Sequence, residues 1–214
     1  MASCAHPGRP LLSALLLMLV TTLVVAQGVR PVPPSALAAI LADPLATPPA
    51  GNARGDVTVV EYFDYNCPVC RHIEPELRQL LASDPKVRLV HKDWPVFGDA
   101  SVYAAYCSFA AAREGKYQIA HDALITSGMD LDSKEDVRAV LRAAGVDLKK
   151  IDADIALHEK EYSEVLARNK RETAVLGLRG TPGLIIGNHL VLGSIDYRQL
   201  KQMIAEARRS GGPL

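Results

Sequence analysis

The sequence lacks several features that would mark whole classes of protein. Its 214 residues include only four cysteines, and its 24 basic side chains are balanced by 24 acidic ones. A small scaffold held together by disulfides would need more cysteines. A chain without excess positive charge gives no indication that it binds nucleic acid or an anionic membrane, so no nucleic-acid partner is expected. We also find no internal repeat and no low-complexity tract, and the length suits one globular domain.

The sequence also lacks an apolar run of ordinary transmembrane length. The uncharged run Leu11 to Val25 is shorter than the roughly 20 residues that span a bilayer. It follows a short segment containing Arg9 and ends in small residues before Gln27. This order is typical of a secretory signal peptide, with an uncleaved membrane anchor as the alternative. We predict that residues 1–26 are a signal peptide and that the protein is exported to a periplasm.

The remaining chain predicts an α/β protein. Residues 27–55 are rich in Pro, Ala and Gly and are interpreted as a linker or arm with a short apolar patch at residues 36–41. A nearly continuous apolar run at residues 57–63 predicts a buried strand, and a helix over 68–82 connects it to a parallel strand at 87–91. Pro75 should kink this helix or end its first part. Further helices are predicted at 103–113, 117–125, 133–144, 148–175 and 195–208, and a hairpin at 184–192.

Cys67 and Cys70 stand at the start of the helix that follows the first buried strand. Two thiols at this spacing lie on one face of a helix and can join in a disulfide. The first also lies where unpaired backbone N–H groups favour an anion, so we expect its thiolate to be stabilised. This pattern favours thiol–disulfide exchange.

A Cys-x-x-Cys pair also occurs in metal and haem sites. Structural zinc usually takes four Cys or His ligands, and the sequence has no second such pair and only scattered histidines. Haem attachment needs a histidine directly after the second cysteine, where this chain has Arg71. A Cu(I) site made by the two thiolates remains open.

Two separate segments resemble a known family. Phe63 to Cys70 and Arg179 to Gly183 resemble the two motifs of DsbA-type thioredoxin-fold proteins. The tail from Ile185 to Asp196 is similar to the exported branch that includes suppressor-of-copper-sensitivity proteins. The resemblance runs from Val57 to Arg208. It implies a thioredoxin-like fold with an inserted helical subdomain, in which residues 56–93 and 178–214 form the thioredoxin-like domain and 94–177 the insertion.

The resemblance also implies roles for individual residues. Cys67 matches the exposed nucleophile and Cys70 the buried resolving thiol of the redox-active disulfide. Pro182 matches a cis-proline facing the disulfide, and Thr181 offers backbone groups to a bound client peptide. Glu61 matches the family's buried acid. Strand alternation independently places Glu61 among apolar neighbours, where it is either a proton-relaying acid or simply a paired or edge residue.

One position departs from the family pattern. The most oxidising members have a histidine between the cysteines, whereas this chain has Val69. Valine cannot donate a hydrogen bond to the Cys67 thiolate, so we expect a weaker oxidant suited to reduction or isomerisation. The preferred direction stays open. Cys107 is interpreted as a small buried apolar residue rather than a third redox thiol.

We therefore predict an enzyme, a protein thiol:disulfide oxidoreductase that forms, reduces or isomerises disulfides through a mixed disulfide. Its expected partners are client proteins with thiols or disulfides and a redox protein that resets the pair. No cofactor and no metal are expected for this chemistry. The alternative is a protein that sequesters Cu(I) with the same two thiols. The sequence does not determine an oligomeric state.

Overall fold

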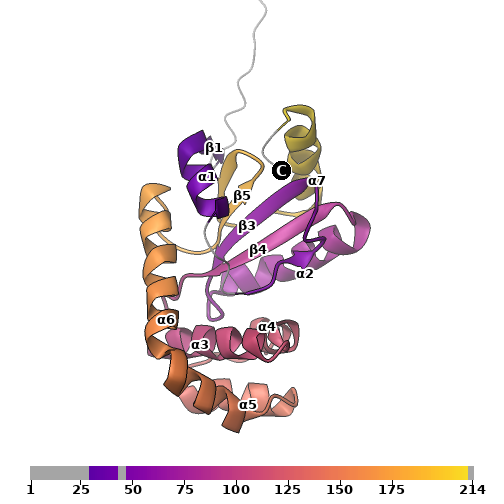
Figure 1. Ribbon diagram of the computed structural model, residues 1–214. Helices are drawn as coiled ribbons and strands as arrows, with labels where there is room; N and C mark the ends of the chain where they lie inside the picture. Colours follow the sequence, from indigo (N-terminus) through magenta and orange to yellow (C-terminus); the bar gives the residue numbers. More distant parts are fainter. Residues whose placement is uncertain (1–28, 43–46, 212–214) are drawn as a thin grey trace, which may run out of the picture.

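The computed structural model describes residues 29–42 and 47–211 (Figure 1). The predicted signal peptide therefore lies outside the described residues. In the described part, strands pair into one mixed sheet of order β1-β6-β5-β3-β4-β2. The strands are β1 Val29–Pro31, β2 Ala50–Gly51, β3 Val57–Phe63, β4 Val87–Asp93, β5 Gly183–Ile186 and β6 His189–Leu192. The helices are α1 Pro34–Ala42, α2 Pro68–Ser83, α3 Asp99–Arg113, α4 Tyr117–Ile125, α5 Lys134–Ala143, α6 Leu148–Val175 and α7 Tyr197–Arg209.

Strand β3 is buried along its whole length and lies between β4 and β5. It pairs in parallel with β4, which confirms the predicted crossover through α2. Strands β5 and β6 form the predicted antiparallel hairpin. Its turn contains Gly187 with φ +59, and a Cβ there would lie 2.7 Å from the Cβ of Ala207 on α7. Only glycine fits both the backbone conformation and this close approach.

Alternation along β3 divides its side chains between the two faces of the sheet. Val57 and Val59 pack with α2 and α7 in one buried cluster. Val60 and Tyr62 pack in another cluster with the helix α1 and the segment after α6. The α2 helix continues through Pro75, so the alternative that this proline ends the first part of the helix is wrong.

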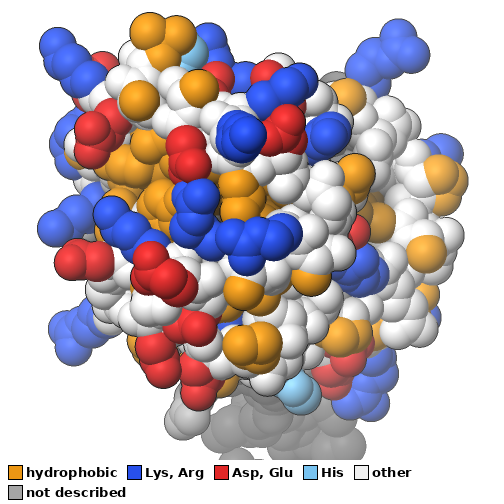
Figure 2. All heavy atoms as spheres, turned by 90° about the horizontal axis from the view of Figure 1, so that it is seen from below, with side chains coloured by type: hydrophobic (Ala, Val, Ile, Leu, Met, Phe, Trp, Pro, Cys, Tyr) orange, Lys and Arg blue, Asp and Glu red, His pale blue; other side chains and the backbone are white. Residues whose placement is uncertain are grey.

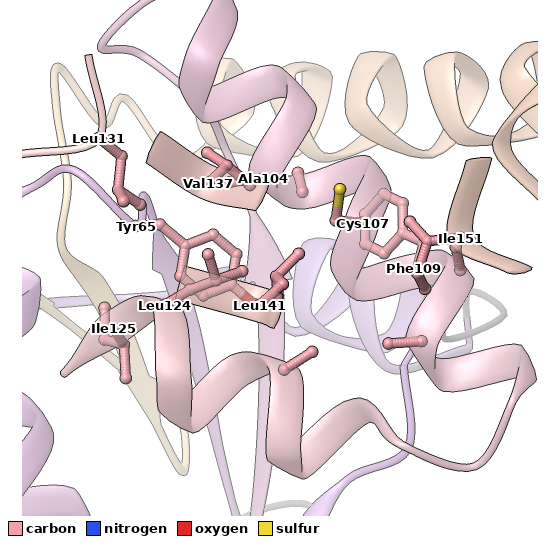
Figure 3. Close-up of a cluster of buried hydrophobic side chains, with 14 of the residues drawn as sticks. Tyr65, Ala104, Cys107, Phe109, Leu124, Ile125, Leu131, Val137, Leu141 and Ile151 are labelled. Carbon is pink, nitrogen blue, oxygen red and sulfur yellow. The ribbon is translucent and has the colours of Figure 1, made fainter. Parts of the chain in front are cut away.

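Helices α3 to α6 follow β4 and form a block beside the sheet, with the long helix α6 reaching back toward α1 (Figure 1). The predicted helix at 133–144 is confirmed as α5, and the Ser133 hydroxyl and the Asp136 carboxylate form a capping box at its start. The block has its own buried cluster, which includes Leu124, Leu131 and Cys107 (Figure 3).

Figure 2 views the molecule from the side of this helical block and shows acidic, basic and hydrophobic side chains interspersed. No single sign of charge dominates this face, in keeping with the equal numbers of acidic and basic residues. Among the described helices, none has the length and apolar character needed to cross a bilayer.

The segment predicted as a linker or arm contributes strands to both edges of the sheet. Strand β1 pairs with β6 and strand β2 pairs with β4. Between them, Leu37 and Ile40 of α1 are buried in the cluster that contains Tyr62. The sequence did not predict these two short strands.

Candidate active site

The redox pair lies where the chain passes from β3 into α2. Cys67 is the N-cap residue of α2, and its Sγ accepts a hydrogen bond from the Cys70 backbone N–H at 3.4 Å. Pro68 occupies the first helical position, where a missing N–H has no consequence. The Cys67 thiol donates to the Thr181 carbonyl at 3.3 Å, and the Thr181–Pro182 bond is cis. The fold thus brings the Cys67, Cys70, Thr181 and Pro182 positions together.

Burial of the two sulfurs differs from the expectation in one respect. The resemblance implied an exposed Cys67, but only 2% of this residue is exposed. The Thr181 carbonyl lies against its sulfur and the residue belongs to the buried cluster of the helical block. Cys70 is 1% exposed, as expected for a resolving thiol.

The environments of the two thiols move their pKa values in opposite directions. A hydrogen bond from the Cys70 side chain is the main reason that the pKa of Cys67 is lowered to about 6, with Thr181 and the backbone at the helix start contributing further. Burial raises the pKa of Cys70 well above its usual range, and its hydrogen bond to Cys67 adds to this effect. Cys67 is therefore the thiolate near neutral pH, and Cys70 holds its proton.

Glu61 lies on β3 behind the redox pair and is 2% exposed. Burial raises the pKa of this carboxyl, and the nearby charges of Glu74, Cys67 and Asp93 raise it further. Its Oε2 atom is 3.6 Å from Nε2 of His91. The carboxyl also acts electrostatically on Cys70. A buried acid whose pKa is raised is suited to carry a proton.

Two polar residues before the cysteines hold the active-site loop, and the sequence did not predict a role for them. Asp64 accepts hydrogen bonds from the backbone N–H groups of Val96 and Phe97 at 2.6 and 3.0 Å. Asn66 donates to the Leu131 carbonyl at 2.7 Å and accepts from the Leu131 N–H at 2.8 Å. These contacts join the loop to the helical block. Their short spacing from Cys67 was the only signal in the sequence.

A groove of ≈ 730 Å³ borders the cis-proline. Two arginines from distant parts of the chain, Arg30 and Arg179, stand at its wall, and Arg30 donates a hydrogen bond to the Leu176 carbonyl at 3.2 Å. The groove is large enough to receive part of a peptide. Its lining residues are Arg30, Gly177, Leu178, Arg179, Gly180, Thr181, Pro182, Leu192 and Gly193.

Cys107 lies inside the helical block on α3 and has no exposed surface (Figure 3). Burial raises the pKa of its thiol to about 12. A thiol this buried and this weakly acidic is unreactive in the native state. This setting agrees with its interpretation as a packed apolar residue.

The fold and the Cys-x-x-Cys site define a thioredoxin-like protein with a helical insertion. Comparison with known proteins identifies the family within this class. The model of the DSBA-like thioredoxin domain family matches residues 58–205. The chain therefore belongs to the DSBA-like thioredoxin domain family, which confirms the fold class and the resemblance inferred from the two motifs.

Solved structures agree with this assignment. A thioredoxin-like oxidoreductase from Silicibacter pomeroyi is 36% identical with a TM-score of 0.73, over 78% of this chain and 94% of that one. The catalytic domain of Proteus mirabilis ScsC is 25% identical with a TM-score of 0.72, over 81% of this chain and 97% of that one.

Curated relatives include both a protein of similar size and much longer ones. The thiol:disulfide interchange protein DsbA of Dickeya dadantii is 27% identical over 64% of this chain and 68% of its own length. The first curated relatives matched are Na⁺/H⁺ antiporters, for example one from Salinispora tropica, of which the chain spans only 24%. The family and the DsbA relative support the predicted oxidoreductase class.

Proposed function

We propose that this protein is an exported thiol–disulfide oxidoreductase that acts on client proteins through Cys67 and Cys70. The observation that carries the proposal is the position of the Cys67 sulfur, held between the Cys70 N–H and the Thr181 carbonyl with its pKa lowered to about 6. The pattern of residues 1–26 supports export, with the periplasm as the destination. A partner redox protein would reset the pair after each cycle.

The proposed reduction of a client disulfide has two exchange steps. The Cys67 thiolate attacks one client sulfur, forming a mixed disulfide and releasing the other client sulfur as a thiolate. Cys70 then loses its proton to the Glu61 carboxylate and attacks the Cys67 sulfur. The Cys67–Cys70 disulfide forms and the second client thiolate leaves. The reverse sequence oxidises a client dithiol.

The groove beside Pro182 is the proposed seat of the client chain. Thr181 lines this groove and its carbonyl contacts the Cys67 thiol, so a peptide bound in the groove would lie close to the reactive sulfur. The small exposed area of Cys67 favours an extended, flexible client segment over a folded surface.

A trapping experiment tests this function. Without the resolving thiol, Cys70→Ser should accumulate covalent client complexes that reductant releases, and Cys67→Ser should form none. Glu61→Gln should still form the mixed disulfide but resolve it about 10²-fold more slowly, because a positioned acid–base group is lost. Complexes are counted on non-reducing gels, and resolution is followed by insulin reduction. If both cysteine variants reduce insulin as fast as the unmodified protein, the proposed oxidoreductase activity is wrong.

The same protein allows a test of the alternative function. Titration of the reduced protein with Cu(I) measures whether the two thiols sequester the metal. Tight one-to-one binding in a protein that neither reduces insulin nor refolds reduced ribonuclease would favour the Cu(I)-binding alternative.

A further inference from the structure

A second group of chemically active side chains lies buried behind the redox pair. It consists of Glu74 on α2, His91 on β4 and His121 on α4, which are 5%, 6% and 0% exposed. One ligand atom from each lies within 4.8 Å of the others. Three elements that are separate in the sequence thus direct two imidazoles and one carboxylate to a single buried point.

His121 is oriented as a metal-ligating histidine would be. Its Nδ1 lies 3.2 Å from the Tyr65 hydroxyl and 3.3 Å from the Tyr117 hydroxyl. Its Nε2 has no hydrogen-bond partner within residues 29–42 and 47–211, and lies 3.8 Å from Oε2 of Glu74. When Nδ1 donates its proton to a hydroxyl, Nε2 keeps a free lone pair directed at Glu74. Metal-bound histidines are commonly fixed in this way through their second nitrogen.

His91 adds a second imidazole with unused nitrogens. Neither ring nitrogen has a hydrogen-bond partner in the described part of the chain. The ring stacks on His121 with centroids 4.3 Å apart and an angle of 26° between the planes. Buried polar atoms in native proteins nearly always have a hydrogen-bond partner. Neighbouring imidazole nitrogens without one therefore indicate that a ligand binds between them.

Acidic side chains gather around the cluster. Glu74, Glu61 and Asp93 are all buried here, and Asp93 lies near enough to act on Glu61. Arg78 donates to Oε1 of Glu74 at 2.7 Å, and the same guanidinium also forms an ion pair with Asp122. A bound cation would give these buried acids a further partner.

We propose that Glu74, His91 and His121 form a buried binding site for a divalent transition metal such as Zn²⁺. Two imidazole nitrogens and one carboxylate oxygen are a donor set that Zn²⁺ takes in proteins. Zinc bonds of about 2.0–2.1 Å in tetrahedral geometry separate ligand atoms by about 3.3 Å. The 3.8 Å between His121 Nε2 and Glu74 Oε2 is too long for a hydrogen bond. The three ligand atoms, which lie within 4.8 Å of one another, would move closer together around a bound metal. The site shares no residue with the thiol pair.

Metal binding is tested on the signal-free chain without an affinity tag and with Cys67 and Cys70 oxidised to the disulfide, so that these thiols cannot bind metal. The protein is stripped with a chelator and titrated with Zn²⁺ by calorimetry and with Co²⁺ by visible absorption. We expect one Zn²⁺ per chain, and Co²⁺ bands of a nitrogen- and oxygen-ligated site without thiolate charge transfer.

Matched variants separate the site from adventitious binding. Glu74→Gln and His121→Gln should lose stoichiometric binding, whereas His72→Gln, which changes an exposed histidine on the same helix, should keep it. Zn²⁺ should raise the Tm of the unmodified protein and of His72→Gln but not of folded Glu74→Gln. Failure of the folded, oxidised protein to bind one Zn²⁺, or full binding by Glu74→Gln, would overturn the proposal. Insulin reduction is measured separately, so either result leaves the proposed enzyme untouched.

Discussion

The pKa of Cys67 is lowered by hydrogen bonds and not by a side chain between the two cysteines. Val69 contributes no side-chain donor, yet the Cys70 thiol, Thr181 and the backbone at the helix start lower the pKa of Cys67 to about 6. This value lies between the cysteine pKa of about 7 in thioredoxin and of about 3.5 in the strong oxidant DsbA. Their potentials are about −270 and −120 mV, so we expect a couple between these limits.

The pH dependence of alkylation tests this environment. Because the folded-state pKa is lowered, the Cys67 thiolate should persist as pH falls, and the alkylation rate should have its midpoint near 6 instead of the ~8.5 of a free thiol. The Cys70 side chain makes the largest contribution, so Cys70→Ala should raise the midpoint. Rates with iodoacetamide across the pH range provide the measurement. A midpoint near ~8.5 in the unmodified protein would contradict the hydrogen-bond account.

The residues of the site differ in how far the sequence could reveal them. Cys67, Cys70 and Pro182 stand in motifs, so the sequence alone was enough to predict their positions. His91 and His121 looked scattered, because they belong to a strand and a helix that only the tertiary fold places in contact. The solvent exposure of Cys67 could not be predicted from the sequence either. This residue is covered because the distant Thr181 carbonyl packs on its sulfur.

At the scale of elements, a buried ion pair fixes the long helix α6 against the sheet. Lys92 on β4 donates to both carboxylate oxygens of Glu172 at 2.7 Å, and the Tyr62 hydroxyl donates to the same carboxylate at 2.7 Å. The Lys92 and Glu172 side chains are 5% and 10% exposed. No local pattern pairs a strand lysine with a glutamate 80 positions later, so this contact was not predicted.

Removing one partner of this pair should destabilise the protein strongly. Glu172→Ala leaves the Lys92 ammonium without this carboxylate, and we expect a loss of about 3–5 kcal/mol in the free energy of unfolding. The matched control is Glu161→Ala on the same helix, whose side chain is 58% exposed in its pair with Arg113. That change should cost at most about 1 kcal/mol. Urea denaturation measures both, and equal losses would contradict a special role for the buried pair.

Element boundaries followed from local signals where such signals existed. The apolar run of β3, the Ser133 cap of α5 and the turn before His189 are all encoded by neighbouring residues. Strands β1 and β2 have three and two residues in a segment rich in Pro, Ala and Gly. They are strands only because β6 and β4 offer free edges, so their formation depends on tertiary pairing.

At the scale of the whole molecule, the buried hydrophobic side chains of residues 29–42 and 47–211 divide into three clusters. The redox pair belongs to the cluster shared with the helical block. Cys67 and Cys70 lie in the cluster that contains Leu124 and Cys107. The cluster between the sheet and helices α2 and α7 contains Leu200 but neither cysteine of the pair. The helical insertion therefore shields the reacting sulfurs, while the sheet supplies the scaffold that carries them.

Because the clusters are separate, two substitutions that each create a buried cavity should affect the redox pair differently. Leu124→Ala and Leu200→Ala each remove a side chain with 0% exposure, and each should lower the free energy of unfolding by about 2–5 kcal/mol. Only Leu124→Ala loosens the packing around the redox pair, so it alone should speed alkylation of Cys70 in the native state. The rate is measured by mass spectrometry in a Cys67→Ser background without denaturant, where local opening governs access. Equal acceleration by Leu200→Ala would mean that global stability, rather than the helical block, protects the resolving thiol.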